Sequence, residues 1–157
     1  MDNSTSYTRT ITVAAGVDDA YRALTAGFGA WWTTACDQII EGIGDHVQVT
    51  FQGLESRWTF KAARLEPGRR VELSCVDSNM VMLDKPEVPH DEWIGSKLCW
   101  RVRPLGDKTE IHFEHRGLTP ELACYDMCEA GWDAYFGESL KAYLETGNGE
   151  PFGAAAT

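Results

Sequence analysis

The sequence predicts an α+β fold in which a curved antiparallel β-sheet wraps around one long C-terminal α-helix. Two observations support this. Apolar and polar residues alternate in six short runs between residues 9 and 115, and one uninterrupted helical pattern fills residues 120–146. Alternation with a period of two is typical of half-buried strands, whereas apolar steps of three and four are typical of a helix. A sheet and a helix that each carry one apolar face are expected to pack those faces together.

The six alternating runs are each about as long as one strand and are bounded by Gly, Pro or Asp. They predict an antiparallel meander at residues 9–14, 46–51, 57–62, 70–76, 97–102 and 109–115. The face expected to point inward is mainly apolar and comprises Ile11, Val13, Val47, Val49, Phe51, Trp58, Phe60, Val71, Leu73, Cys75, Leu98, Trp100, Val102, Ile111, Phe113 and His115. The opposite face is polar or charged, as in a sheet with one face in water.

The helical pattern lies between residues suited to helix ends. Pro120 suits a first turn, Thr119 can cap its free amides, and Gly147 can end the helix in a left-handed conformation. Aromatic and small side chains form one broad face of this helix: Tyr125, Cys128, Trp132, Phe136, Ser139 or Leu140, and Tyr143. We therefore expect this face to lie against the concave side of the sheet.

Two short helices are predicted directly after the first strand. Residues 16–27 predict a helix that Asp18 caps and Gly27 ends, and residues 28–32 predict a second short turn. Together they can close one end of a curved sheet. Residues 77–91 interrupt the strand pattern with two prolines and an apolar group at Met80–Leu83. This segment is either a lid over a cavity or a loop pinned to the sheet edge, and the sequence favours neither.

Composition predicts a single domain over residues 1–157, with an ordered core at about 7–152. A chain of 157 residues that is 43% hydrophobic can bury a stable core. It contains no apolar run of bilayer length, and its first residues lack the features of a secretory signal, so we expect a cytoplasmic protein. Five cysteines, an odd number without framework spacing, indicate reduced thiols.

The net charge of −10 is concentrated in the C-terminal helix. The residues after Arg116 hold seven acidic side chains and one basic side chain, Lys141. An acidic surface repels nucleic acid backbones and anionic lipid. We therefore expect neither nucleic acid nor a membrane as a partner.

Several segments follow one another in an order that points to a known family. They are the first strand with Val17–Leu24, then Ala30–Trp32, Trp93–Ser96, Thr109–Leu118 and Trp132–Phe152. In this order, over residues 7–152, they resemble the activator-of-heat-shock-protein-90-ATPase-like branch of the START-like (SRPBCC, Bet v 1-like) superfamily. The resemblance implies the helix-grip fold, with an apolar cavity between sheet and helix.

The resemblance does not select a function, because family members range from lipid and polyketide binders through cyclases to chaperone cofactors. Members that activate the chaperone carry a further co-chaperone domain, which this sequence lacks. Contact with a chaperone is therefore not expected.

Large inward side chains predict an apolar space that admits a flat or greasy molecule. The residues expected to line it are Phe51, Trp58, Phe60, Cys75, Trp100, Phe113, His115, Tyr125, Cys128, Trp132 and Phe136. The leading hypothesis is a binding protein that holds a small hydrophobic or aromatic molecule in this cavity without a cofactor. The alternatives are a cavity enzyme and a module that binds a chaperone or another partner protein, and the chain could form a homodimer.

For the enzyme alternative, His115 is the one weak catalytic candidate. A histidine beside a Cys or Tyr in an apolar pocket can act as acid or base in a cyclase, dehydratase or hydrolase-like reaction. A lone inward histidine more often satisfies a buried polar group.

No cofactor or metal site is predicted. The sequence has no Gly-rich phosphate loop and no nucleophile elbow. Cys124 and Cys128 lie one helical turn apart, whereas His112 and His115 fall on opposite faces of a regular strand, so no set of four metal ligands converges.

Overall fold

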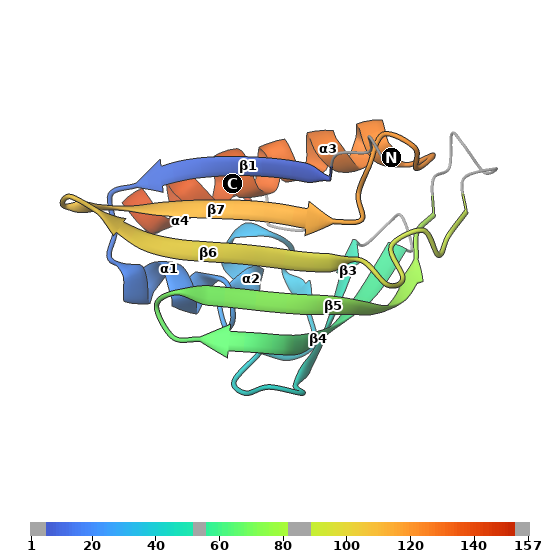
Figure 1. The fold of residues 1–157 in the computed structure, drawn as a ribbon, viewed down its shortest axis with the longest axis horizontal. Coiled ribbons are helices and arrows are strands. Elements are labelled where there is room, and N and C mark those ends of the chain that lie inside the picture. The colour runs from blue at the N-terminus through green and yellow to red at the C-terminus, as the bar shows by residue number, and fades with distance from the viewer. Residues whose placement is uncertain (1–5, 52–55, 82–88, 153–157) are drawn as a thin grey trace, which may run out of the picture.

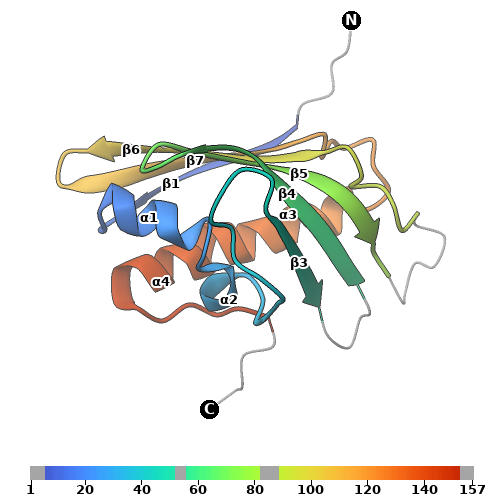
Figure 2. The ribbon, with the colours of Figure 1, turned by 90° about the horizontal axis from the view of Figure 1, so that it is seen from below.

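The computed structural model describes residues 6–51, 56–81 and 89–152. In these residues a seven-stranded antiparallel sheet curls around a long C-terminal helix (Figures 1 and 2). Two short helices follow the first strand and lie on the same side of the sheet as the long helix. The predicted α+β helix-grip fold is therefore confirmed.

The strands are β1 (Tyr7–Val13), β2 (Ala35–Cys36), β3 (His46–Phe51), β4 (Ser56–Glu66), β5 (Arg70–Asn79), β6 (Lys97–Leu105) and β7 (Lys108–Arg116). Their order in the sheet is β1-β7-β6-β5-β4-β3-β2. Strands β2 to β7 form the predicted meander, but β1 departs from it because it pairs with β7, with Ile11 opposite Ile111. The sequence analysis also missed β2, which is only two residues long.

The predicted inward face of the sheet is correct. Val47, Phe60, Leu73, Trp100 and Phe113 are completely buried, and Phe51 is half-buried near the open end of the sheet. Because side chains alternate along a strand, every second register pair between neighbouring strands places side chains together on the inward face. Trp100 pairs with Phe113 in this way, and their rings stack at 4.9 Å.

The long helix consists of α3 (Tyr125–Ala134), a π-helical segment η1 (Tyr135–Leu140) and α4 (Lys141–Thr146). The prediction that it starts at Pro120 with a Thr119 cap is wrong, because the preceding residues form separate turns. Instead, the Glu92 carboxylate, from a loop far away in the sequence, accepts hydrogen bonds from the amides of Ala123 (3.1 Å) and Cys124 (3.0 Å). The predicted helix end is correct: Gly147 has a φ of 87°.

A polar cluster at Asp133 fixes the helix to the first strand. The Asp133 carboxylate accepts a hydrogen bond from the Tyr7 hydroxyl (2.6 Å) and pairs with Arg9 (3.1 Å). The Arg9 guanidinium lies over Gly137 in η1, where an added Cβ would come within 2.6 Å of it. The absence of a side chain at position 137 therefore lets the widened helical turn approach β1.

The short helices are α1 (Val17–Ala23) and α2 (Phe28–Trp31). Asp18 was expected to cap α1, but Gly16 occupies the N-cap position and no side chain caps the helix. The indole N–H of Trp31 donates to the carbonyl of Ala23 at 2.8 Å. This buried hydrogen bond fixes α2 against α1, so the two helices close one end of the sheet as predicted.

The segment at residues 77–91 begins as part of β5, which continues to Asn79. Met80 is buried, and its amide donates to the carbonyl of His90 at 2.9 Å. Residues 82–88, including Leu83, lie outside the described residues, and a lid role for the segment stays a prediction. Over the parts of the chain that the structure describes, no helix has the length and apolar character needed to cross a membrane.

Candidate ligand pocket

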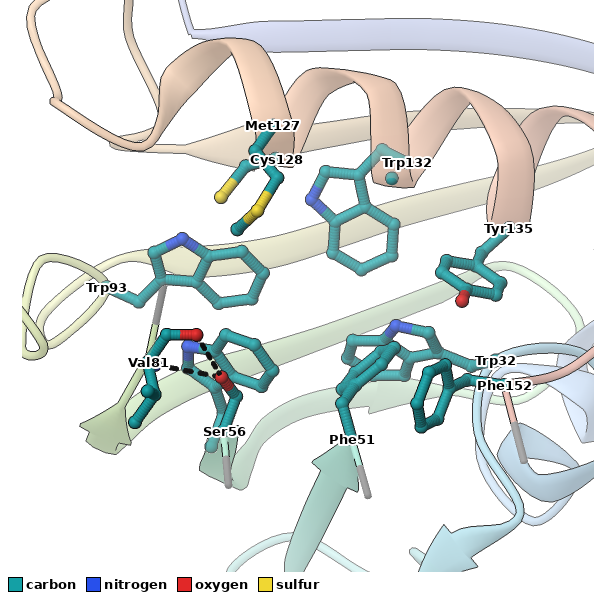
Figure 3. Close-up of a pocket in the computed structure, with 12 residues that line it drawn as sticks. Trp32, Phe51, Ser56, Val81, Trp93, Met127, Cys128, Trp132, Tyr135 and Phe152 are labelled. Atoms are coloured by element: carbon teal, nitrogen blue, oxygen red, sulfur yellow. Dashed lines mark hydrogen bonds between the residues drawn. The ribbon is translucent and has the colours of Figure 1, made fainter. Parts of the chain in front are cut away.

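A pocket of about 230 Å³ lies between α3 and the strands β3 and β4 (Figure 3). Its described walls are mainly aromatic and come from both halves of the chain: Trp32, Phe51, Ser56, Trp58, Val81, Trp93, Met127, Cys128, Gly131, Trp132, Tyr135 and Phe152. None of these side chains carries a charge. The pocket is therefore suited to apolar, flat molecules.

One edge of the long helix forms the roof of the pocket. Met127, Cys128, Gly131, Trp132 and Tyr135 follow one another at alternating steps of one and three residues, which places them along one stripe of the helix. The centre of the predicted aromatic face lies on the neighbouring surface of the same helix, where Phe136 is completely buried against Phe113. The helix therefore uses one edge of its apolar face for the pocket and the rest for the core.

Four tryptophans, Trp32, Trp58, Trp93 and Trp132, contribute to the pocket wall. Trp93 stacks on Trp58, with ring centroids 4.8 Å apart, and lies nearly parallel to Trp132, at 6.1 Å and an interplanar angle of 13°. Trp132 also contacts Trp32 at 5.0 Å. Contacts between these large, flat rings give the walls a fixed shape at a low cost in side-chain entropy.

The C-terminal segment after the helix closes one side of the pocket. The Phe152 amide donates to the carbonyl of Trp32, and the Phe152 carbonyl accepts from the amide of Thr34, both at 2.9 Å. The Phe152 ring packs against Phe51 at 5.0 Å. These contacts place Phe152 beside Trp32, although the two residues lie far apart in the sequence.

Behind the wall, a buried hydrogen-bond chain connects Trp132 to the Trp93 loop. The Trp132 indole N–H donates to Nδ1 of His115 at 3.0 Å, and Nε2 of His115 lies 2.9 Å from the Ser96 hydroxyl. That hydroxyl donates to the carbonyl of Trp93 at 2.6 Å. Since Nδ1 accepts, Nε2 must carry the proton and donate to Ser96.

The environment of His115 keeps its ring neutral. His115 is completely buried, and burial lowers its pKa from 6.5 to about 3. Both ring nitrogens are engaged by Trp132 and Ser96, and His115 is not among the described lining residues. This arrangement suits a group that orients two walls of the pocket.

The thiols near the site stay protonated at neutral pH. The Cys124 thiol and burial together raise the pKa of Cys128, and burial raises the pKa of Cys75 to about 12. A protonated thiol is a poor nucleophile and metal ligand. The described residues also contain no group of three or more His, Cys, Asp or Glu side chains that could hold a metal ion.

Of the residues expected to line the cavity, the structure places Phe51, Trp58, Cys128 and Trp132 in the pocket wall. The remaining predicted residues lie outside the pocket lining: Phe60, Trp100, Phe113, Phe136, Cys75 and His115 are buried in the core, and the Tyr125 hydroxyl donates to Glu129. Sequence reasoning missed three smaller lining residues, Ser56, Val81 and Gly131, and five large ones, Trp32, Trp93, Met127, Tyr135 and Phe152. Three of the five large residues are aromatic with a polar group: Trp32 and Trp93 lie in loops, and Tyr135 lies beside the predicted aromatic face of the helix. Their residue type is a signal that could have identified them.

The comparisons with known proteins agree with the fold described above. A family model described as "Activator of Hsp90 ATPase homolog 1-like protein" matches residues 14–145. The chain belongs to this family. No curated protein matches the chain. The chain resembles the solution structure of the Aha1 dimer from Colwellia psychrerythraea with 25% identity and a TM-score of 0.72, covering 92% of this chain and 99% of that one.

Two further solved structures share the fold of this chain. DynU16, a protein from the dynemicin biosynthetic locus, is 18% identical with a TM-score of 0.66, and the match covers 95% of this chain but 49% of DynU16. CV1439 from Chromobacterium violaceum is 15% identical with a TM-score of 0.68, covering 90% of this chain and 98% of that one. Both support the fold alone.

Proposed function

We propose that this protein binds a small, flat, apolar molecule in the pocket under the long helix. The observation that carries the proposal is an uncharged cavity of about 230 Å³ with a mainly aromatic wall. An apolar cavity of about 150 Å³ is already large enough for a benzene ring. A volume of about 230 Å³ suits a molecule of about two fused rings.

The rigidity of the wall supports the same proposal. The Trp93 side chain is fixed by stacking on Trp58, and its loop is held by the Ser96 hydroxyl and by Glu92, which binds the start of α3. A site that is formed before the ligand arrives loses little entropy on binding. Packing alone would not require so many fixed contacts around an empty space.

The test uses the tryptophans that line the pocket. Purified protein is titrated with naphthalene while tryptophan fluorescence is recorded, and freshly purified protein is examined by native mass spectrometry for a bound small molecule. We expect saturable quenching by naphthalene. A hydrophobic dye serves as a second probe. The proposal would be contradicted if naphthalene does not quench the fluorescence, the mass spectrum shows only ligand-free protein, and naphthalene displaces no dye.

The enzymatic alternative has weaker support. Its candidate residue, His115, is completely buried, uses both ring nitrogens in hydrogen bonds and has a pKa lowered to about 3. A group of this kind neither reaches a pocket ligand nor exchanges a proton easily near pH 7. If turnover of a hydrophobic substrate were found, abolition of it by His115→Gln in a folded protein would revive the assignment.

A homodimer is a further proposal, supported by the similarity to a protein whose structure is a dimer. Light scattering coupled to size-exclusion chromatography distinguishes a monomer from a dimer of this 17.5 kDa chain. The activity in the family's name is not carried over to this chain, and we continue to expect no contact with a chaperone.

A further inference from the structure

The pocket wall offers hydrogen-bond donors that have no partner. The indole N–H of Trp32, on the pocket wall, has no partner in the described part of the chain, whereas the unpartnered indole N–H groups of Trp58 and Trp93 are closed to water and to a pocket ligand alike. Trp32 is only 3% exposed, so its donor has little access to water. A buried donor without a partner costs about 1–3 kcal/mol, which a ligand with an acceptor atom can recover.

The hydroxyl of Tyr135 is a second polar group on the wall without a partner in the described part of the chain. Figure 3 shows the Tyr135 ring extending from the helix toward Phe51 and Phe152, with the hydroxyl at its far end. The ring is held edge-on against Phe51 at 5.8 Å. Burial raises the pKa of Tyr135, so the phenol keeps its proton and can donate it.

No free acceptor of comparable strength balances these donors. The only other hydroxyl on the described wall, that of Ser56, accepts from the Val81 amide at 2.8 Å and donates to the Val81 carbonyl at 3.3 Å. Cys128 contributes a weak thiol donor. The unused polarity of the described wall is therefore that of a donor, at two sites beside an apolar space, the Trp32 indole and the Tyr135 hydroxyl.

Resting on the proposed function, we infer that the ligand is an uncharged, flat molecule of about two fused rings whose edge carries a hydrogen-bond acceptor, such as a carbonyl oxygen or ring nitrogen, and that the Tyr135 hydroxyl donates to it. A carboxylate on the ligand is excluded because burying an unpaired charge costs too much free energy, and the described wall has no cation to pair with it. A purely hydrocarbon ligand would leave both donors unpaired.

The experiment compares probes of one shape. Naphthalene has no acceptor, quinoline and isoquinoline carry one ring nitrogen at different positions, and 2-naphthoate carries a charge. Affinities are measured by tryptophan fluorescence for the wild type, for Tyr135→Phe and for Tyr143→Phe. Tyr143 lies in α4 outside the lining residues, so its variant loses the same atom without touching the pocket.

We expect Tyr135→Phe to weaken the tighter of the two nitrogen probes about 3- to 10-fold, the effect of one hydrogen bond, and to change naphthalene affinity by less than about 2-fold. Tyr143→Phe should change neither, and 2-naphthoate should bind at least about 10-fold more weakly than quinoline. If naphthalene binds but Tyr135→Phe leaves both nitrogen probes unchanged, this inference fails while the proposed function stands. If no probe binds, both fail.

Discussion

The indole N–H of Trp132 donates a hydrogen bond to Nδ1 of His115 at 3.0 Å, and this bond joins the long helix to the last strand of the sheet. The two rings meet edge to face, with centroids 5.9 Å apart. Because Nε2 of His115 binds Ser96 on the other side, one buried imidazole holds the helix, the strand and the Trp93 loop together. Stability and pocket shape are therefore expected to respond together when this histidine changes.

Replacement of His115 should destabilise the fold strongly. His115→Ala removes a fully buried ring and leaves the Trp132 indole N–H without its acceptor, so we expect a loss of about 2–4 kcal/mol in the free energy of unfolding. Urea denaturation gives this value. His112→Ala on the same strand is the control, because His112 lies on the opposite face and bonds only Thr10 at an exposed position. Equal losses in both variants would contradict a bridging role for His115.

Stability should fall on mild acidification because of His115. The unfolded chain binds a proton at this residue near pH 6.5, whereas the folded protein resists it down to about pH 3. The stabilisation is therefore fully present above pH 6.5 and is lost as the pH falls toward 3. Between pH 7 and pH 5 the wild type should lose about 2 kcal/mol more than His115→Gln, which has no proton to bind. If urea denaturation shows that the wild type and His115→Gln lose the same stability between pH 7 and pH 5, His115 is not a neutral buried histidine.

Glu92 should stabilise the start of α3 from a distance. Its carboxylate accepts from the amides of Ala123 and Cys124, as a capping residue would, so Glu92→Ala should cost about 1–2 kcal/mol. Hydrogen exchange at these two amides should accelerate. Glu121→Ala, at an exposed position close to the same helix start, should change neither quantity. Unchanged exchange in Glu92→Ala would show that the turns cap the helix without it.

A methyl group at position 131 should separate stability from binding. Gly131 lies inside α3, lines the pocket, and would meet no atom within 4 Å if it carried a Cβ. Gly131→Ala should raise stability by about 0.5–1 kcal/mol, because alanine favours the helix, and should weaken naphthalene binding. The bulkier Gly131→Leu should abolish it. Gly29→Ala, in α2 and also without a Cβ contact, is the control that leaves binding intact. Unchanged binding in Gly131→Leu would place the ligand elsewhere.

The sheet and the helix face could be predicted from the sequence because burial of one face imposes a period on the residues. The inward strand residues, including Phe60 and Phe113, follow from this period alone. The pairing of β1 with β7 could not be derived this way, since the same alternation satisfies either neighbour. The start of α3 was misplaced because its cap, Glu92, is supplied by a residue about thirty positions away, which no local pattern contains.

The site was harder to predict than the core for a related reason. Periodicity marks the centre of an apolar face, which is Phe136, whereas a pocket forms where that face diverges from the sheet, at Gly131 and Tyr135. The partners of His115 depend on tertiary contacts to Ser96 and Trp132 that spacing cannot give. The aromatic composition of the wall was predictable, but which aromatic residues form it was not.

The hydrogen bonds that join Phe152 to Trp32 and Thr34 have a consequence for how the protein is made. All seven strands of the sheet and the entire long helix precede Phe152 in the chain, yet the pocket wall is incomplete until this residue reaches Trp32 and Thr34. A nascent chain emerging in order from the ribosome could therefore assemble its sheet while still lacking a closed pocket. The capacity to capture a ligand would be the last property the growing polypeptide acquires.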